Sequence, residues 1–218
     1  MSGMSQELRA RLAADYGPVR TLPSPWARAL WLLPFAVMAV ATAPLVFDLR
    51  PDASRLGWMG LWGASSLQVL IGLALMVAAL REAVPGRGWN HAAIALWIGL
   101  PLVVVMAVTL NSWVVSPALL RLGGWMVGLA CFASSAASGL PIVALASVLA
   151  ARAYPTRPAL AGALLGLGSG LMADAGWRLF CHFSEPAHVL SAHVGAVLMS
   201  MLIGALLASA ICRAQRRS

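Results

Sequence analysis

Residues 158–193 read PALAGALLGLGSGLMADAGWRLFCHFSEPAHVLSAH and hold both the apolar segment and the reactive side chains around which the chain is organised. Up to residue 180 the stretch is rich in Ala, Gly and Leu, and as one helix it is long enough to cross a hydrocarbon core of ~30 Å. Gly162, Gly166 and Gly170 recur every four residues, a spacing that lets a second helix pack closely. The remainder carries a cysteine, three histidines and a glutamate, which suit a metal-binding or redox-sensitive site or, alternatively, cap helix ends.

The composition of the whole chain is that of an integral membrane protein. Of its 218 residues, 61% are hydrophobic and only 10% are charged, more apolar surface than a soluble core of this size can bury. All 15 basic residues are Arg, and because they flank apolar runs they indicate membrane topology rather than nucleic acid binding. Three cysteines without a C-x-x-C motif exclude a disulfide framework and argue against a thioredoxin-type motif or a zinc ribbon.

The apolar segments predict an all-α integral membrane protein with six transmembrane helices in a domain of residues 26–212. Ser24 followed by Pro25 is typical of a helix cap and first helical position, which starts the first span. No small-residue cleavage site follows that span, so no cleaved signal peptide is expected. The predicted spans are residues 27–47, 59–80, 91–110, 123–150, 158–180 and 188–211.

The distribution of arginines predicts the orientation of these spans. An even number of spans places both termini on one side, together with eleven arginines that include those of the basic tail, residues 213–218. The opposite side has four, namely Arg50, Arg55, Arg121 and Arg178. Since positively charged loops stay in the cytoplasm, both termini are predicted to be cytoplasmic.

The N-terminal segment, residues 1–25, is the only polar stretch long enough to bind a partner. Its apolar residues recur at the spacing of one helical face and predict a short amphipathic helix: Leu8, Leu12 and Tyr16. A helix of about three turns is marginal alone in water, so it is expected to fold on a partner or on the membrane. In the second alternative Arg9 and Arg11 lie near lipid phosphates and the helix is a surface anchor.

Asp174 and Arg178 are charged residues near the outer end of the fifth span. Their i, i+4 spacing allows an ion pair on one helical face. An acid within a span is costly and indicates function by default, but the nearby arginine favours a local pair close to the membrane interface.

Cys131 and Cys181 are predicted to lie at the same height in the membrane. Counted from Pro155 in the turn between two spans, Cys131 lies 24 residues before and Cys181 lies 26 residues after. In an antiparallel helix pair that rises ~1.5 Å per residue, both reach the outer, periplasmic edge. A disulfide there requires Cα atoms within about 7 Å, and two separate buried thiols are the alternative. Cys212 lies on the opposite side and is excluded from this pair.

Three histidines close to Cys181 in the sequence add potential ligands for zinc, cadmium or copper: His182, His188 and His193. Their spacing matches no zinc motif, so no resident metal or other cofactor is predicted. Transient capture of a thiophilic metal at Cys131 and Cys181 remains an expectation. For His182 and His188 the alternative is a solvated loop position, whereas His193 is a polar group within the start of a span.

Several short motifs, in order along the chain, resemble the NrsF-like family of six-span membrane anti-sigma factors. They are PVRTLPSPWARAL at 18–30, FDLRPD at 47–52, AVPGR at 83–87, RPALAGALLGLGSGL at 157–171 and the Cys181-His182 pair before a final Arg-ended span. The resemblance covers essentially the whole chain and rests on the order and spacing of the motifs.

That resemblance implies a protein of the bacterial inner membrane whose cytoplasmic N-terminus holds an extracytoplasmic-function (ECF) sigma factor. The implied partners are this sigma factor and the lipid bilayer, with no direct nucleic acid contact and no catalysis. Sensing of a stress signal falls on Cys131 and Cys181, and sigma binding falls on the segment around Leu8, Leu12 and Tyr16, to which we assign Arg9 and Arg11.

Two other functions are weighed against this one. A small six-span transporter of an ion or small molecule would use Asp174, but Arg178 lies one turn away and the two halves of the chain show no repeat. A membrane thiol oxidoreductase would need a reactive cysteine pair, usually with C-x-x-C spacing, which the sequence lacks.

Overall fold

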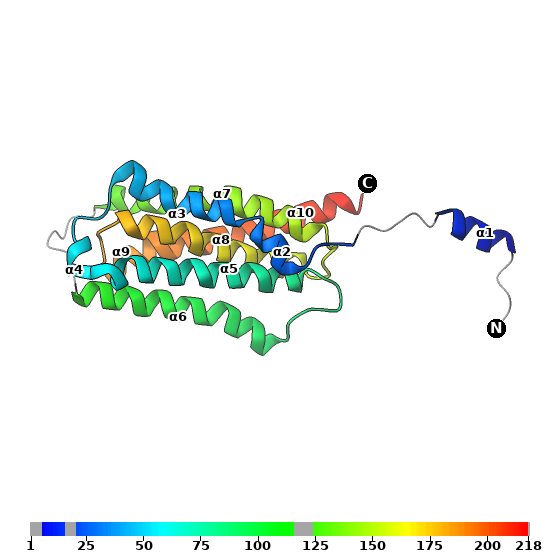
Figure 1. Ribbon diagram of the computed structural model, residues 1–218, viewed down its shortest axis with the longest axis horizontal. Coiled ribbons are helices and arrows are strands. Elements are labelled where there is room, and N and C mark those ends of the chain that lie inside the picture. Colours follow the sequence, from blue (N-terminus) through cyan, green and yellow to red (C-terminus); the bar gives the residue numbers. More distant parts are fainter. Residues whose placement is uncertain (1–5, 16–20, 116–123, 218) are drawn as a thin grey trace.

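The computed structural model describes residues 6–15, 21–115 and 124–217, with the side chains of residues 8, 9, 12, 13 and 15 outside this description. Every regular element in the described residues is helical (Figure 1). Six of the helical segments are long and apolar enough to cross a membrane. The predicted all-α class with six membrane-length helices is therefore confirmed.

The six membrane-length segments are continuous helices or short helices joined end to end. The first comprises α2 (Pro25–Leu30) and α3 (Leu33–Phe47); the second comprises α4 (Ala53–Trp58), the π-helical turn η1 (Met59–Gly63) and α5 (Ala64–Glu82). The next three are α6 (His91–Val115), α7 (Trp125–Ala151) and α8 (Pro158–Phe180). The last comprises α9 (Pro186–His188), the π-helical turn η2 (Val189–Val194) and α10 (Gly195–Gln215).

Some of these helices run past the limits that hydropathy predicts. The second begins at Ala53, the third continues to Val115 and the sixth to Gln215. Hydropathy marks only the apolar part of a helix, whereas backbone hydrogen bonds continue into its polar ends.

The antiparallel helices form a bundle with two distinct ends. We call the end where α2 begins and α10 finishes the termini end, and the end where α9 and the start of α7 lie the cysteine end (Figure 1). A further helix, α1 (Gln6–Asp15), lies beyond the termini end in the same view. The chain therefore places its polar N-terminal helix and its basic C-terminal tail at one end of the bundle.

Helix α8 is the centre of the bundle. In its most apolar 18-residue window 89% of the residues are buried, against 17–44% in the other five segments. Helices α3, α5, α7 and α10 pack around it. A side chain on α8 is thus surrounded by protein, and a polar group there must find its partners on neighbouring helices.

Close packing of α8 against α10 follows from the predicted glycine face. A Cβ added at Gly162 or Gly166 would collide with the backbone of α10 at Gly204 or Ser200. At Gly170 it would lie 2.9 Å from the Cα of Val197. The small-residue spacing therefore does bring two helix backbones together.

At the termini end the first span begins as the sequence predicts and is then fixed by a buried arginine. The Ser24 hydroxyl accepts a hydrogen bond from the backbone N–H of Ala27, 3.2 Å away, before the helix proceeds. The Arg28 guanidinium, 1% exposed, donates to the carbonyls of Leu80 (2.9 Å) and Leu149 (3.2 Å). These carbonyls belong to the last turns of α5 and α7, where the helix dipole attracts a cation.

Candidate metal centre

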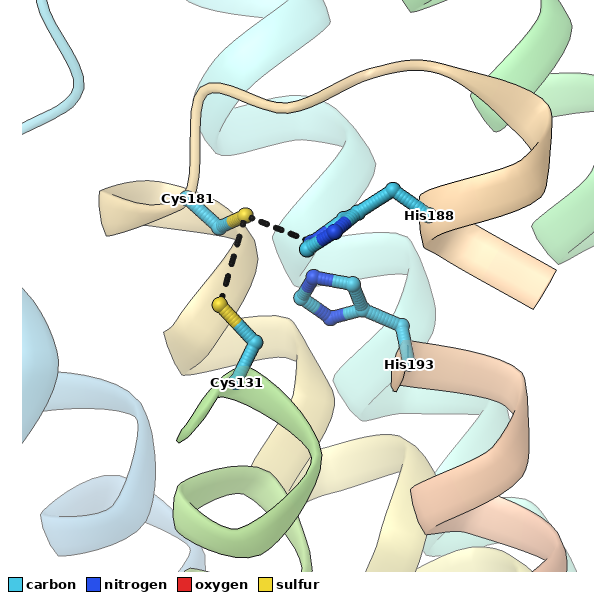
Figure 2. A group of neighbouring side chains, drawn as sticks. All are labelled: Cys131, Cys181, His188 and His193. Carbon is cyan, nitrogen blue, oxygen red and sulfur yellow. Dashed lines mark hydrogen bonds between the residues drawn. The ribbon is translucent and has the colours of Figure 1, made fainter. Parts of the chain in front are cut away.

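Two thiols and two imidazoles converge at the cysteine end and form what we call the thiol–imidazole cluster: Cys131, Cys181, His188 and His193 (Figure 2). One ligand atom from each residue lies within 4.8 Å of the corresponding atom of every other. The Sγ atoms of the two cysteines are 3.9 Å apart, and Cys181 Sγ is 3.4 Å from His188 Nε2. Both cysteines are free thiols in this structure.

The cysteines meet because α7 and α8 are antiparallel and joined by a short turn. Cys131 lies two turns into α7, and Cys181 directly follows α8, its N–H bonded to the Trp177 carbonyl at 2.8 Å. Both side chains are buried, at 8% and 5% exposure. The structure thus has them at one level, as the residue count from Pro155 predicts, and also facing each other, which the count does not determine.

The π-helical turn η2 explains why His188 and His193 share one face. Residues five apart point in different directions on an α-helix, but the i→i+5 hydrogen bonding of a π-helix brings them one above the other. Their rings lie 5.4 Å apart, edge to face. His188 is half-buried and in contact with Cys181, so its alternative position in a solvated loop is wrong.

His182 lies outside the thiol–imidazole cluster, although it is next to Cys181 in the sequence. The chain is extended at Cys181, and successive side chains of an extended segment point to opposite sides. The His182 ring points away from the cluster residues and packs on the Phe183 ring, with ring centroids 4.2 Å apart. The structure thus brings two of the three candidate accessory ligands, His188 and His193, close to the cysteines.

A buried carboxylate fixes the orientation of His193. Asp174 Oδ1 lies 2.5 Å from His193 Nδ1, and this leaves Nε2 on the side of the cysteines (Figure 2). Asp174 Oδ2 accepts hydrogen bonds from Gln68 Nε2 (2.7 Å) and Arg178 Nε (2.8 Å). A carboxylate behind an imidazole is the usual support of a metal-binding histidine, because it fixes the tautomer and the ring plane.

The Asp174–Arg178 pair is thus present, and it is part of a buried network that extends beyond these two residues. Asp174 is 1% exposed, and its partners come from α5, α8 and η2. The Arg178 guanidinium also donates to Thr109 Oγ1 on α6, at 3.2 Å. Both carboxylate oxygens are occupied, so Asp174 is no free ion-binding group of the kind that a transporter needs.

Arg50 holds the segment between α8 and α9, and the sequence does not reveal this role. Its guanidinium pairs with Asp52 (2.6 Å) and donates to Ser184 Oγ (2.8 Å), while its backbone N–H bonds to the Leu179 carbonyl (2.9 Å). These contacts fix the chain on both sides of Cys181.

The Cys181 pKa is raised, first by the hydrogen bond with the Cys131 thiol and then by burial, so the group is a neutral thiol at neutral pH.

The candidate sigma-binding residues are described only in part. Arg11 is exposed on α1 and pairs with Glu7 at 2.9 Å. Tyr16 and the side chains of Leu8, Arg9 and Leu12 lie outside the described residues. Cys212 is buried on α10 at the termini end, away from the other two cysteines.

The fold and the cluster together define the class: a helical protein with six segments long and apolar enough to cross a membrane, two thiols and two imidazoles gathered at one end, and a polar N-terminal helix at the other. Within that class, the chain belongs to the NrsF family, described as "Negative regulator of sigma F", whose model matches residues 12–213. No curated protein and no solved structure matches the chain. The family match confirms the resemblance found in the sequence and identifies the function as negative regulation of a sigma factor.

Proposed function

We propose that the protein is an anti-sigma factor of the bacterial inner membrane that holds an ECF sigma factor and releases it when the thiol–imidazole cluster captures a thiophilic metal or is oxidised. The observation that carries this proposal is the approach of four soft ligand atoms to within 4.8 Å of one another. Sigma regulation comes from the family, and sensing by Cys131 and Cys181 is what the resemblance implies. The part that His188 and His193 take in this sensor is our own assignment.

The cluster has close to the dimensions of a tetrahedral metal site. With Zn–S of about 2.3 Å and Zn–N of about 2.0 Å, two thiolates lie about 3.8 Å apart, and thiolate and imidazole about 3.5 Å apart. The observed separations are 3.9 Å between the sulfurs and 3.4 Å between Cys181 and His188. A metal would therefore tie α7, the end of α8 and η2 together with small movements.

Oxidation of the same pair is the second form of the signal. Two thiols lose two protons and two electrons to an oxidant and form one disulfide, whose S–S bond is about 2.0 Å long. Since the sulfurs are 3.9 Å apart, they would have to approach, by rotation of the two side chains or by movement of α7 against the end of α8. Both signals thus act on the same pair of helices.

The arginine distribution supports an orientation with the termini end in the cytoplasm and the thiol–imidazole cluster at the periplasmic face. This orientation gives the cluster access to an oxidising compartment and to external metals. It gives α1 access to a sigma factor. Leu8, Leu12 and Tyr16, with Arg9 and Arg11 beside them, would dock as one face of a helix in a groove of that partner.

Helix α7 offers a physical connection between the two ends. It carries Cys131 near its start, and its Leu149 carbonyl near its end accepts a hydrogen bond from Arg28. Arg28 belongs to α2, which begins directly after the N-terminal segment. A shift of α7 on metal capture would change the contact between Arg28 and Leu149. The sigma factor is released if the protein with metal bound holds it less tightly than the protein without metal.

Co-purification tests the sigma-binding half of the proposal. Tagged protein is isolated from its native membranes under reducing conditions and the bound proteins are identified by mass spectrometry. We expect one sigma factor in stoichiometric amount, lost from the double variant Leu8→Asp/Leu12→Asp and kept by Ala10→Asp/Ala14→Asp, which adds two charges to the same helix at exposed positions. Retention of the sigma factor by the leucine variant would show that this face does not bind it.

A further inference from the structure

A pocket of about 440 Å³ lies beside the thiol–imidazole cluster, between the start of α7 and the segment of α9 and η2. Helix α7 lines it with Trp125, Gly128 and Phe132, and the opposite wall is formed by Glu185, His188 and Ser191. His188 belongs to both the pocket and the cluster, since its Nε2 contacts Cys181. The pocket therefore lies against one residue of the cluster.

The other side of the cluster is closed. A cavity of only about 10 Å³ adjoins Cys181 and His193 there, and it is lined by Arg50 and Arg178. Such a volume is at the lower limit for a single water molecule, about 10–15 Å³. A cation thus has no route to the thiols from this side.

We propose, on the basis of the function proposed above, that the pocket beside His188 is the entrance through which a soft divalent cation reaches the four ligands, and that Glu185 selects for positive charge. The Glu185 side chain is partly exposed and forms no ion pair with any residue that the structure describes. Its carboxylate raises the local concentration of cations and lowers that of anions, such as metal oxyanions.

The charge of the cation that is captured is balanced by the protons that the thiols release. The cation passes Glu185, reaches His188, which lines the pocket, and is then bound by His188, the two sulfurs and His193. The two thiols lose one proton each to solvent as they become thiolates, so a doubly charged ion replaces two protons and no electrons are exchanged.

Gly128 gives a direct way to block the pocket. A Cβ added there meets nothing within 4 Å, so a side chain can be introduced without a collision at its first atom. Gly128 lines the pocket, and a phenylalanine ring at this position would take up part of the pocket volume. Gly99 on α6 is equally open and lines neither cavity, so Gly99→Phe is the matched control. Glu185→Gln removes the charge and keeps the shape.

The test measures the rate at which cadmium binds to the full-length protein in lipid nanodiscs. Binding is monitored in a stopped-flow instrument by the absorbance of the cadmium–thiolate bond. A neutral maleimide that alkylates thiols is the second probe. We expect Gly128→Phe to slow both reactions, on the order of tenfold or more, because the pocket must first rearrange. We expect Glu185→Gln to slow only cadmium, on the order of threefold at low salt, and Gly99→Phe to change neither rate.

The possible results separate the entrance from the site itself. If the unsubstituted protein does not bind cadmium, the metal centre is wrong and the entrance with it. If it binds cadmium but Gly128→Phe binds at the same rate, the centre stands and the entrance is overturned. Equal slowing of both probes by Glu185→Gln would overturn the charge selection alone, and equal slowing by Gly99→Phe would overturn the location of the entrance.

Discussion

Replacement of Asp174 by asparagine tests how the bundle supports its ligands. Asp174→Asn keeps the size of the side chain but removes the charge that faces His193 Nδ1 at 2.5 Å. Loss of such a support behind a metal-binding histidine typically weakens metal affinity 10- to 100-fold. We therefore expect cadmium affinity to fall by about 1.4–2.7 kcal/mol, since each factor of ten is about 1.4 kcal/mol.

The same substitution also affects folding, and the two effects are separable. Arg178, partly buried beside Asp174, would lose its ion pair and keep its bonds to Thr109. Loss of one partner of a buried pair costs about 3–5 kcal/mol, and the remaining bonds indicate the lower end. Gln68→Met is the control, because it removes a hydrogen bond to Oδ2 of Asp174 but leaves the Oδ1 contact with His193.

The assay is a competition titration of cadmium against a coloured chelator, on folded protein in nanodiscs, with chemical unfolding measured in parallel. Asp174→Asn should lose both metal affinity and stability, whereas Gln68→Met should lose stability alone. Unchanged cadmium affinity in Asp174→Asn would refute the reasoning that this carboxylate orients His193 for metal binding.

Two further predictions concern packing and coupling. Gly166→Val should destabilise the bundle by about 1–3 kcal/mol or more in chemical unfolding, because the added carbons collide with the Ser200 carbonyl, whereas Gly99→Val should change little. Arg28→Met should abolish metal-induced sigma release in a pull-down, because it breaks the contact with Leu149, and it should leave cadmium affinity unchanged. The control is Arg87→Met, which replaces an exposed arginine at the same end of the bundle and should release the sigma factor normally. Normal release by Arg28→Met would show that coupling does not pass through this contact.

The bundle was largely predictable from the sequence because its determinants are local. Twenty or so consecutive apolar residues specify a spanning helix whatever its neighbours are. The spacing of Gly162, Gly166 and Gly170 specifies a face for close packing, and α10 occupies that face. The level of Cys131 and Cys181 follows from a residue count because a helix has a fixed rise.

The partners within the site were not predictable, because they depend on helix rotation and on distant residues. Gln68 lies 106 positions from Asp174 in the chain, and nothing local shows that they meet. One signal was available: a lone amide within an apolar span needs a buried partner. The shared face of His188 and His193 depends on a π-helical turn, which periodicity based on an α-helix misses.

The most direct test of the account is the amount of sigma factor that remains bound to the protein in nanodiscs as cadmium is added. The account predicts release as cadmium reaches one equivalent per protein, and none from the double variant Cys131→Ser/Cys181→Ser. Cys212→Ser, whose thiol is buried at the other end of α10, should release normally. Cadmium-induced release from the double variant, or complete retention by the unsubstituted protein, would contradict the claim that this cluster is the sensor.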